Sequence, residues 1–319
     1  MATVVITGVS SFIGCQLAAF FNDTHAVLGT VTGDVARYEG IKRERLEFLA
    51  SESIAVEKLD ITETGELTHF AEKHKPDLWI HHAGYASRYS SFDFDIQKGF
   101  AVNVVPLYTL IPVLKKIRCR GIVCTGTNAE YGDDAKPNRE ADSCYPSLPY
   151  GLSKLAQTIA LSQLSRRFAF PARVVRVYNP FGRFDEPDKL IAYAVAKLKK
   201  GEKVDLSPCL QKRDFIYIQD LLRLYGAVLG DLDKGGFEIY NGCSGSPVAL
   251  RDLLSALCRQ LGRPAELLDF TARTLRPDES MFSCGSTEKI TSVLGFAHTY
   301  DLHRGVGDYL KSLEEGCLL

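Results

Sequence analysis

Short apolar runs alternate with stretches of helical periodicity along the first half of the chain. The β-branched run from Thr3 to Thr7 predicts a buried strand, and the apolar positions between Phe12 and Phe20 have the spacing of a helix. The same alternation returns with strand-like runs at Ala26 to Thr32, Val56 to Ile61, Leu78 to Gly84 and Gly121 to Thr125, and with helical segments at Leu67 to His74 and Phe100 to Leu107. Such alternation builds a right-handed, doubly wound parallel sheet. We therefore predict an α/β fold whose first domain covers residues 1–178.

The regular alternation of strands and helices ends after Gly182. Lys189 to Lys200 has helical spacing, Val204 to Leu206 is a short strand, and Leu250 to Leu261 is again helical. We predict a smaller C-terminal α/β domain over residues 179–319 that mainly binds substrate. Segments near 214–242 are expected to return to the main sheet.

Composition and charge narrow the class of protein. The 319 residues are 45% hydrophobic, and 38 basic and 39 acidic side chains are interspersed to give a net charge of −1. Because the charges are mixed, the sequence shows no concentration of positive charge that would bind nucleic acid or a membrane surface. No apolar run reaches the roughly 18 residues of a membrane span, and the N-terminus enters a strand directly. We expect a cytoplasmic protein.

The cysteines and histidines do not suggest a metal site. The nine Cys follow neither a paired ligand spacing nor a disulfide framework, so we interpret them as reduced, small apolar residues. His81 and His82 are adjacent on a predicted strand, where neighbouring side chains point to opposite faces. They are not expected to share one ion.

The turn from Gly8 to Gly14 lies between the first strand and the first helix. Unpaired N–H groups and the helix dipole favour an anion at a helix N-terminus, and this layout is typical of the pyrophosphate site of a Rossmann domain. The alternative is a glycine turn that only connects strand to helix.

The end of the second strand bears on the choice of cofactor. An NAD site usually places an acid there to bind the ribose hydroxyls, but this chain has Val31 and Thr32, followed by Arg37. Without a carboxylate an adenosine 2′-phosphate is not repelled, and Arg37 is placed to approach it. We predict NADP (as NADPH), with NAD as the alternative if Asp34 performs the acid role and Arg37 is a surface residue.

Tyr150 and Lys154 lie one helical turn apart in a segment whose later apolar positions form a buried stripe. A Tyr hydroxyl exchanges protons poorly at neutral pH, and a fixed ammonium beside it lowers its pKa. Roughly one such pair is expected by chance in a chain of this composition. Thr127 follows the strand that ends near Thr125, where α/β sheets bind ligands. It either bonds a substrate oxygen or caps an ordinary loop.

These features together resemble an extended short-chain dehydrogenase/reductase, and more closely the NAD-dependent epimerase/dehydratase group that acts on nucleotide sugars. The resemblance rests on motifs that occur in order along nearly the whole chain. They are Thr7-Gly8-x-x-x-x-Ile13-Gly14, Asp60-Ile61, the His-x-Ala pattern at His81, Asn103, Thr127 before Tyr131-Gly132, Tyr150-x-x-x-Lys154, Arg176 to Gly182, Gln211 to Asp220, and Arg276-Pro-Asp278.

The resemblance implies roles for individual residues. Tyr150 would be the acid/base, Lys154 would hold the nicotinamide ribose and lower the Tyr pKa, and Thr127 would share the hydrogen bond to the reacting oxygen. Cofactor contacts would come from Gly8, Ser10, Ser11, Phe12, Ile13, Gly14, Thr32, Arg37, Asp60, Ile61, Ala83, Gly84, Asn103, Thr125, Tyr150, Lys154 and Tyr178. Substrate contacts would come from Tyr85, Ser87, Asn128, Asn179, Arg213 and Arg276, the arginines binding a diphosphate.

Two departures from the family pattern are informative. Ser11 replaces the middle glycine of the turn and adds a Cβ near the pyrophosphate. Asn128 and Ala129 stand where 4,6-dehydratases carry an Asp-Glu pair, and loss of water across two carbons needs that extra acid and base. The second departure argues against 4,6-dehydratase activity.

The leading hypothesis is an NADPH-dependent ketoreductase that acts at C4 of a nucleoside-diphosphate 4-keto-6-deoxyhexose. The first alternative is a nucleotide-sugar 4-epimerase that retains one NAD, and the second is a nucleotide-binding sensor without turnover. The resemblance also implies a homodimer formed through the helix that carries Tyr150 and Lys154.

Overall fold

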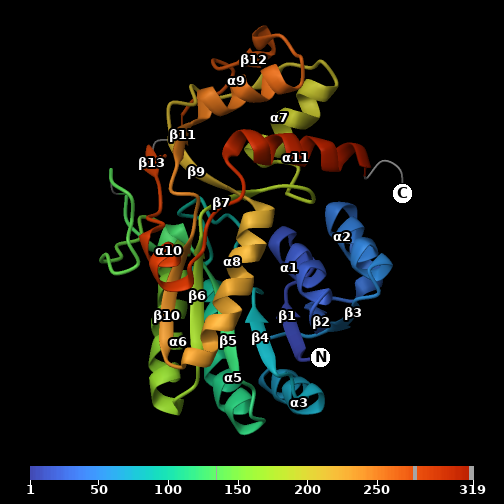
Figure 1. Ribbon diagram of the computed structural model, residues 1–319, viewed down its shortest axis with the longest axis vertical. Helices are drawn as coiled ribbons and strands as arrows, with labels where there is room; N and C mark the ends of the chain where they lie inside the picture. The colour runs from blue at the N-terminus through green and yellow to red at the C-terminus, as the bar shows by residue number, and fades with distance from the viewer. Residues whose placement is uncertain (134, 276–278, 316–319) are drawn as a thin grey trace.

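Seven parallel strands form the central sheet, in the order β10-β6-β5-β4-β1-β2-β3 (Figure 1). The computed structural model describes residues 1–133, 135–275 and 279–315. The strands are β1 (Thr3–Thr7), β2 (Ala26–Val31), β3 (Ala55–Lys58), β4 (Leu78–His81), β5 (Gly121–Thr127), β6 (Ala172–Val177) and β10 (Phe237–Gly242). The strand order reverses between β1 and β4, and ligands of such sheets bind beyond the carboxyl ends at that point. The predicted doubly wound α/β fold is confirmed.

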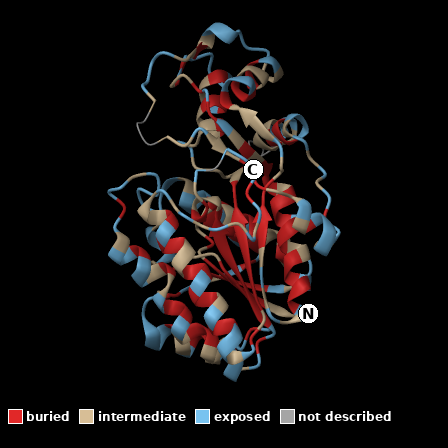
Figure 2. Cartoon of the chain, turned by 90° about the vertical axis from the view of Figure 1, so that its left-hand side faces the viewer, coloured by how far each residue is buried: buried red, intermediate tan, exposed pale blue. Residues whose placement is uncertain are grey.

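Helices cover both faces of this sheet. One face carries α1 (Phe12–Asn22), α2 (Gly40–Ser51) and α8 (Ile218–Asp231), and the other carries α3 (Thr64–His74), α5 (Val105–Lys116) and α6 (Pro149–Phe168). The inner strands β1, β2, β4, β5 and β6 are almost wholly buried, as Figure 2 shows, whereas the edge strands β3 and β10 are partly exposed.

The helix predicted through Phe100 and Leu107 is in fact two. Helix α4 (Ile96–Asn103) has Val104 as its C-cap, and α5 starts at Val105. Pro106 accounts for the break, because it has no N–H to continue the helical hydrogen bonds and is favoured in the first turn of a helix.

The smaller part of the molecule is built on a second sheet. Its strands are β7 (Asn179–Phe181), β9 (Lys212–Tyr217), β11 (Pro247–Ala249) and β13 (Phe282–Ser283), and β8 (Val204–Asp205) pairs separately with β12 (Leu268–Asp269). Around them lie α7 (Leu190–Lys199), α9 (Leu250–Gln260) and α11 (Leu302–Glu315), while α10 (Glu288–Leu294) packs on β10. Of the segments near 214–242, β10 is the edge strand of the main sheet and α8 packs on that sheet, whereas β9 lies in the small sheet.

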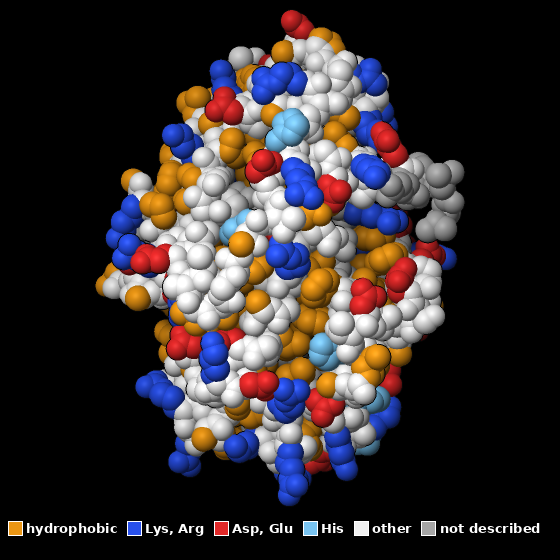
Figure 3. Space-filling view, viewed as in Figure 1, with side chains coloured by type: hydrophobic (Ala, Val, Ile, Leu, Met, Phe, Trp, Pro, Cys, Tyr) orange, Lys and Arg blue, Asp and Glu red, His pale blue; other side chains and the backbone are white. Residues whose placement is uncertain are grey.

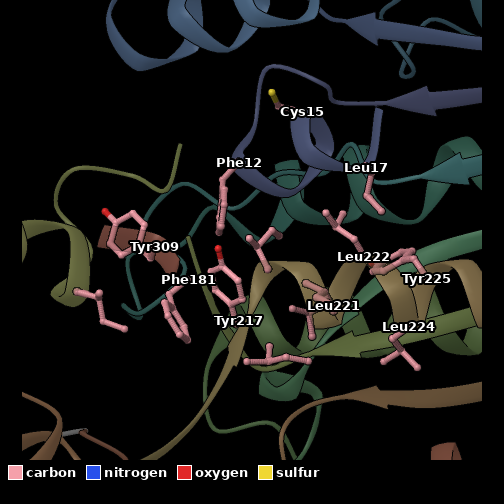
Figure 4. Close-up of a cluster of buried hydrophobic side chains, with 14 of the residues drawn as sticks. Phe12, Cys15, Leu17, Phe181, Tyr217, Leu221, Leu222, Leu224, Tyr225 and Tyr309 are labelled. Carbon is pink, nitrogen blue, oxygen red and sulfur yellow. The ribbon is translucent and has the colours of Figure 1, made fainter. Parts of the chain in front are cut away.

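One hydrophobic cluster joins the two parts. Phe12 of α1, Tyr217 of β9 and Tyr309 of α11 belong to it together with the inner face of α8 (Figure 4). Helix α1, which follows the predicted dinucleotide turn, thereby shares its hydrophobic core with the small sheet.

Basic and acidic side chains are interspersed over the face drawn in Figure 3. No helix in the described part of the chain is long and apolar enough to cross a membrane.

Candidate active site

The turn between β1 and α1 is shaped by two glycines. Gly8 has a φ of +78°, and a Cβ built on it would lie 2.9 Å from the Ala83 Cα. A Cβ on Gly14 would lie 2.3 Å from the Gly8 carbonyl oxygen. Only glycine fits either position, and the result is a cradle whose backbone a ligand can approach closely.

Ser11 begins helix α1 as its N-cap. Its Oγ donates to the Gly8 carbonyl at 2.7 Å and accepts the Gly14 N–H at 3.2 Å, so the hydroxyl bonds the turn itself. The first-turn amides of Phe12 and Ile13 have no partner within the helix and suit an anion. Ser10 is held from the other side, because Arg45 Nη1 donates to its carbonyl at 3.0 Å. The cradle and its free amides fit a dinucleotide pyrophosphate.

A pocket of about 700 Å³ lies at the carboxyl end of β2. Its lining is Thr32, Gly33, Asp34, Val35, Arg37, Tyr38 and Lys58. Asp34 Oδ1 accepts the Ala36 N–H at 3.0 Å and so caps the short helical turn Val35–Arg37. Arg37 and Lys58 are both exposed to solvent.

Lys58 was missed in the sequence. It is the last residue of β3 and pairs with Val31, the last residue of β2. In a doubly wound sheet the third strand often flanks the second, and that neighbourhood is the signal that would have pointed to Lys58.

The ends of β3 and β4 are fixed by local hydrogen bonds. Asp60 Oδ1 accepts the Thr62 N–H at 2.9 Å and the Thr62 hydroxyl at 2.7 Å, and Ile61 is buried. After β4 the N–H of Ala83 donates to Thr7 Oγ1 at 3.0 Å. The loop that follows β4 is thereby held against β1.

Asn103 ties the next loop to helix α6. Its Oδ1 accepts the Tyr85 N–H at 2.7 Å, and its Nδ2 donates to Ser153 Oγ at 3.1 Å. A Cβ on Gly84 would lie 3.0 Å from the same Oδ1. Asn103 is wholly buried and is therefore a structural link, while Ser87 lies exposed further along this loop.

Tyr150 is the second residue of α6, after Pro149 at the helix start. Its half-buried ring packs edge-on against Tyr89 and Phe94, with ring centroids 5.8 and 5.7 Å apart. Burial raises the pKa of Tyr150 well above its ordinary value, the Glu130 carboxylate raises it further, and a hydrogen bond with the Thr127 side chain partly offsets this. Tyr150 and Thr127 therefore meet as a protonated phenol and a hydroxyl.

Lys154 follows one turn later and is buried. Its Nζ donates to the Thr125 carbonyl at 2.8 Å and to Gln157 Oε1. Burial lowers the pKa of Lys154, and the Glu130 carboxylate opposes that shift. The expected lowering of the Tyr150 pKa by Lys154 is not seen here, because the ammonium bonds these two oxygens and burial dominates at the phenol.

Glu130 is a further residue that was missed. Its wholly buried carboxylate accepts the Thr127 N–H at 3.0 Å, the Thr158 hydroxyl at 2.8 Å and Arg176 Nε at 2.8 Å. Thr127 and Glu130 form a capping box around the turn Asn128–Glu130. The Thr-x-x-Glu spacing is the sequence signal that would have revealed it. The capping box fixes the backbone that presents the Thr127 hydroxyl.

A neutral polar layer lies behind Lys154. Thr125 Oγ1 shares hydrogen bonds with His82 Nδ1 at 2.8 Å and with the Tyr225 hydroxyl at 2.7 Å. Burial lowers the pKa of His81 and of His82 to about 3, so both rings are uncharged. Over residues 1–133, 135–275 and 279–315 no group of three or more His, Cys, Asp and Glu side chains is placed to hold a metal ion.

The predicted substrate residues lie where the two parts meet. Asn128 Nδ2 donates to Ser283 Oγ of β13 at 2.9 Å, and Asn179 Nδ2 donates to the Asp214 carbonyl at 2.8 Å. Neighbouring Arg213 pairs with Glu279 at 2.9 Å. Arg276 lies outside the described residues.

Tyr178, expected at the cofactor, has its side chain in a separate buried cluster. Its ring packs with Tyr131 and Cys243, and its hydroxyl donates to Asn138 Oδ1 at 3.2 Å. The position of Tyr178 at the end of β6 is thus set mainly by packing.

A family model described as "NAD dependent epimerase/dehydratase family" matches residues 4–242. The chain belongs to this family. Among its relatives, GDP-6-deoxy-D-mannose reductase of Pseudomonas aeruginosa is 25% identical over 86% of this chain and 85% of its own length. The dTDP-glucose 4,6-dehydratase of Salmonella typhimurium is 25% identical over 75% and 71%.

Solved structures of the epimerase/dehydratase type share the fold. The UDP-glucose 4-epimerase of Thermotoga maritima with UDP-glucose superposes with a TM-score of 0.85 and 18% identity, covering 99% of both chains. The family resemblance predicted from the motifs is confirmed.

Proposed function

We propose that this family member is an NADPH-dependent reductase of nucleoside-diphosphate 4-keto-6-deoxyhexoses, reducing the ketone at C4. The observation that carries the proposal is the pocket at the end of β2, where Arg37 and Lys58 are the two basic side chains of the lining. A reductase consumes its cofactor in every turnover, whereas an epimerase keeps one NAD through a closed cycle.

The pocket favours a 2′-phosphate over a free ribose hydroxyl. Arg37 and Lys58 bring two positive charges, and Thr32 adds a hydroxyl. Asp34 is the acid of this lining, and one of its oxygens already caps the turn that follows. These residues would hold the adenosine end of the cofactor, while the Gly8 to Gly14 turn would hold its pyrophosphate. When bound, NADPH supplies the hydride for the carbonyl carbon.

The protonation of Tyr150 suits reduction. A ketone that gains a hydride at carbon also needs a proton at oxygen, so the acid must start protonated. The raised pKa of Tyr150 keeps its proton in place at neutral pH. Thr127, hydrogen-bonded to it, would share the bond to the substrate oxygen.

The residues beside Thr127 argue against elimination of water. Asn128 donates its amide to Ser283, and Ala129 has no functional group. Neither can serve as the second acid or base that a 4,6-dehydratase requires. The similarity to a reductase that acts on a GDP-linked 6-deoxysugar supports a nucleotide sugar as substrate, with Asn179 and Arg213 at its diphosphate end.

The proposed assembly is a homodimer. Exposed apolar side chains gather on the neighbouring helices α5 and α6, where Val105, Tyr108, Leu152 and Ile159 are 58, 52, 47 and 51% exposed. Such a patch on adjacent helices suits a second copy of the chain. Sedimentation of the wild type and of Ile159→Glu tests this, since the variant should sediment as a monomer.

The first experiment is to denature the purified protein and identify any released nicotinamide nucleotide by mass spectrometry. An empty or exchangeable site, followed by NADPH oxidation when a nucleoside-diphosphate 4-keto-6-deoxyhexose is added, supports the reductase. Near-stoichiometric NAD that survives purification would instead favour the 4-epimerase, which uses the same Thr127, Tyr150 and Lys154. Failure to bind any nicotinamide nucleotide would contradict both.

A further inference from the structure

Gln157 lies one helical turn beyond Lys154, on the buried side of α6, and is 2% exposed. Its Oε1 accepts a hydrogen bond from Lys154 Nζ. Its other amide atom, Nε2, is buried and has no hydrogen-bond partner among the residues that the structure describes. One end of this side chain thus bonds the lysine, and the other end bonds nothing in the described part of the chain.

The orientation of this amide follows from the chemistry of its neighbour. An ammonium offers only donors, so the amide must turn its oxygen toward Lys154 and its NH₂ group away. A buried NH₂ without a partner destabilises the folded state. Gln157 therefore supplies an acceptor to Lys154 but leaves its own NH₂ group unpaired, which lowers the stability of the folded state. An apolar side chain of equal size would not leave such a group unpaired.

The two acceptors account for two of the three protons on Lys154 Nζ. The Thr125 carbonyl takes one at 2.8 Å, and Gln157 takes another. The Thr125 carbonyl belongs to the rigid strand β5 and Gln157 to α6, so the ammonium is held between two fixed elements. The remaining N–H is available to a ligand.

We propose that Gln157 is a positioning residue that fixes the Lys154 ammonium, in its charged form, so that one N–H is left for the bound nicotinamide dinucleotide. The inference rests on the dinucleotide site of the proposed function and is independent of the sugar.

The surroundings of Lys154 make the charge of this ammonium sensitive to Gln157. Glu130 is the carboxylate that faces it, while Cys124 of β5 and His81 and His82 of β4 are neutral, since burial raises the pKa of Cys124 to about 12 and lowers those of both rings to about 3. Burial lowers the pKa of Lys154 itself. An oxygen that accepts from the charged form raises that pKa again. Removing the oxygen should let Lys154 lose its proton at lower pH, and a carboxylate in its place should do the opposite.

The test is the dissociation constant for NADPH, followed by its fluorescence from about pH 6 to about pH 10, in the wild type, Gln157→Met and Gln157→Glu. The pH at which affinity falls should move down by about one unit in Gln157→Met and up by a similar amount in Gln157→Glu. Ser165→Ala is the matched control, because Ser165 is a buried polar residue of the same helix whose hydroxyl donates to the Phe170 carbonyl at 2.7 Å. It should leave the profile unchanged.

A purely structural role makes a different prediction. Gln157→Met would then lower the melting temperature and weaken NADPH equally at every pH, and that result would overturn the proposal. If the wild type binds NADH and not NADPH, the NADPH preference in the proposed function fails while the same titration with NADH still tests Gln157. Binding of neither nucleotide would overturn both.

Discussion

Arg176 and Glu130 form an ion pair at 2.8 Å in which both side chains are at most 2% exposed. The pair lies beneath the capping box that presents Thr127, so one carboxylate serves both the core and the site. A carboxylate in this position balances a buried guanidinium and also faces Tyr150 and Lys154.

Replacing Glu130 with Ala should strongly destabilise the fold. The change leaves the buried charge of Arg176 without a partner. Loss of one partner of a buried ion pair lowers the free energy of unfolding by roughly 3–5 kcal/mol. Urea unfolding measures this directly. Glu47→Ala, which removes the partner of Arg43 in a surface pair, is the control and should have no measurable effect. Equal stability of the two variants would contradict the role given to Glu130.

Tyr150→Phe should lower kcat by a factor of about 10²–10⁴, because it removes the proton donor. The dissociation constant for NADPH should change little. Steady-state kinetics with the 4-keto sugar nucleotide and fluorescence titration separate the two effects. Tyr145→Phe alters a residue that is 78% exposed and should behave as the wild type. Full activity of Tyr150→Phe would sink the mechanism.

Replacing both Arg37 and Lys58 with Ala should weaken NADPH by about 10- to 100-fold and leave NADH nearly unchanged, because only the 2′-phosphate needs the two charges. Isothermal titration with both nucleotides gives the ratio. Lys42→Ala removes a nearby exposed charge outside the pocket lining and serves as the control. An equal loss of affinity for NADPH and NADH would mean that the pocket does not bind the 2′-phosphate.

Asp185 should make stability depend on pH near neutrality. Burial raises the pKa of this carboxyl to about 7, and the Glu186 N–H that bonds it at 2.8 Å offsets only part of the shift. A raised carboxyl pKa means that the folded state keeps a proton that the unfolded chain has already lost. Its contribution is therefore full below about pH 4 and declines as the pH rises through about 7.

The variant Asp185→Asn removes this titration. It should melt above the wild type at about pH 8, and the difference should vanish toward about pH 4. Thermal unfolding across this range is the measurement, with Asp188→Asn on the exposed part of the same loop as control. A pH-independent difference would show that Asp185 does not ionise as described.

The sequence predicts five strands of the main sheet, β1 to β5, from their own apolar runs, but it does not predict the strand β6 or the helix α2. The run Thr3 to Thr7 is an example. The apolar stripe predicted for α6 is only partly buried, because Ile159 is 51% exposed while the polar Lys154 and Gln157 face the interior. The small sheet is different, since β7 and β13 have three and two residues and are strands only through pairing with β9. So short a segment has no readable pattern.

In the site, too, features set by local sequence can be predicted, and features set by the packing of distant elements cannot. The spacing of Tyr150 and Lys154 is visible in one turn of sequence, and so is the capping box that was overlooked at Glu130. That Lys154 bonds the Thr125 carbonyl depends on how α6 lies over β5, which no local period encodes. The bond orders the ammonium before any ligand arrives.

The route of the chain through the two sheets bears on how the protein folds. Helix α8 and strand β10 come after β9 in sequence, yet they complete the main sheet. A fragment ending at residue 178 would leave β6 as an open edge and uncover the face of α1 that packs on α8. Open edges and bare apolar faces are templates for aggregation. We therefore expect the fragment 1–178 to be less stable and more prone to aggregation than the full chain.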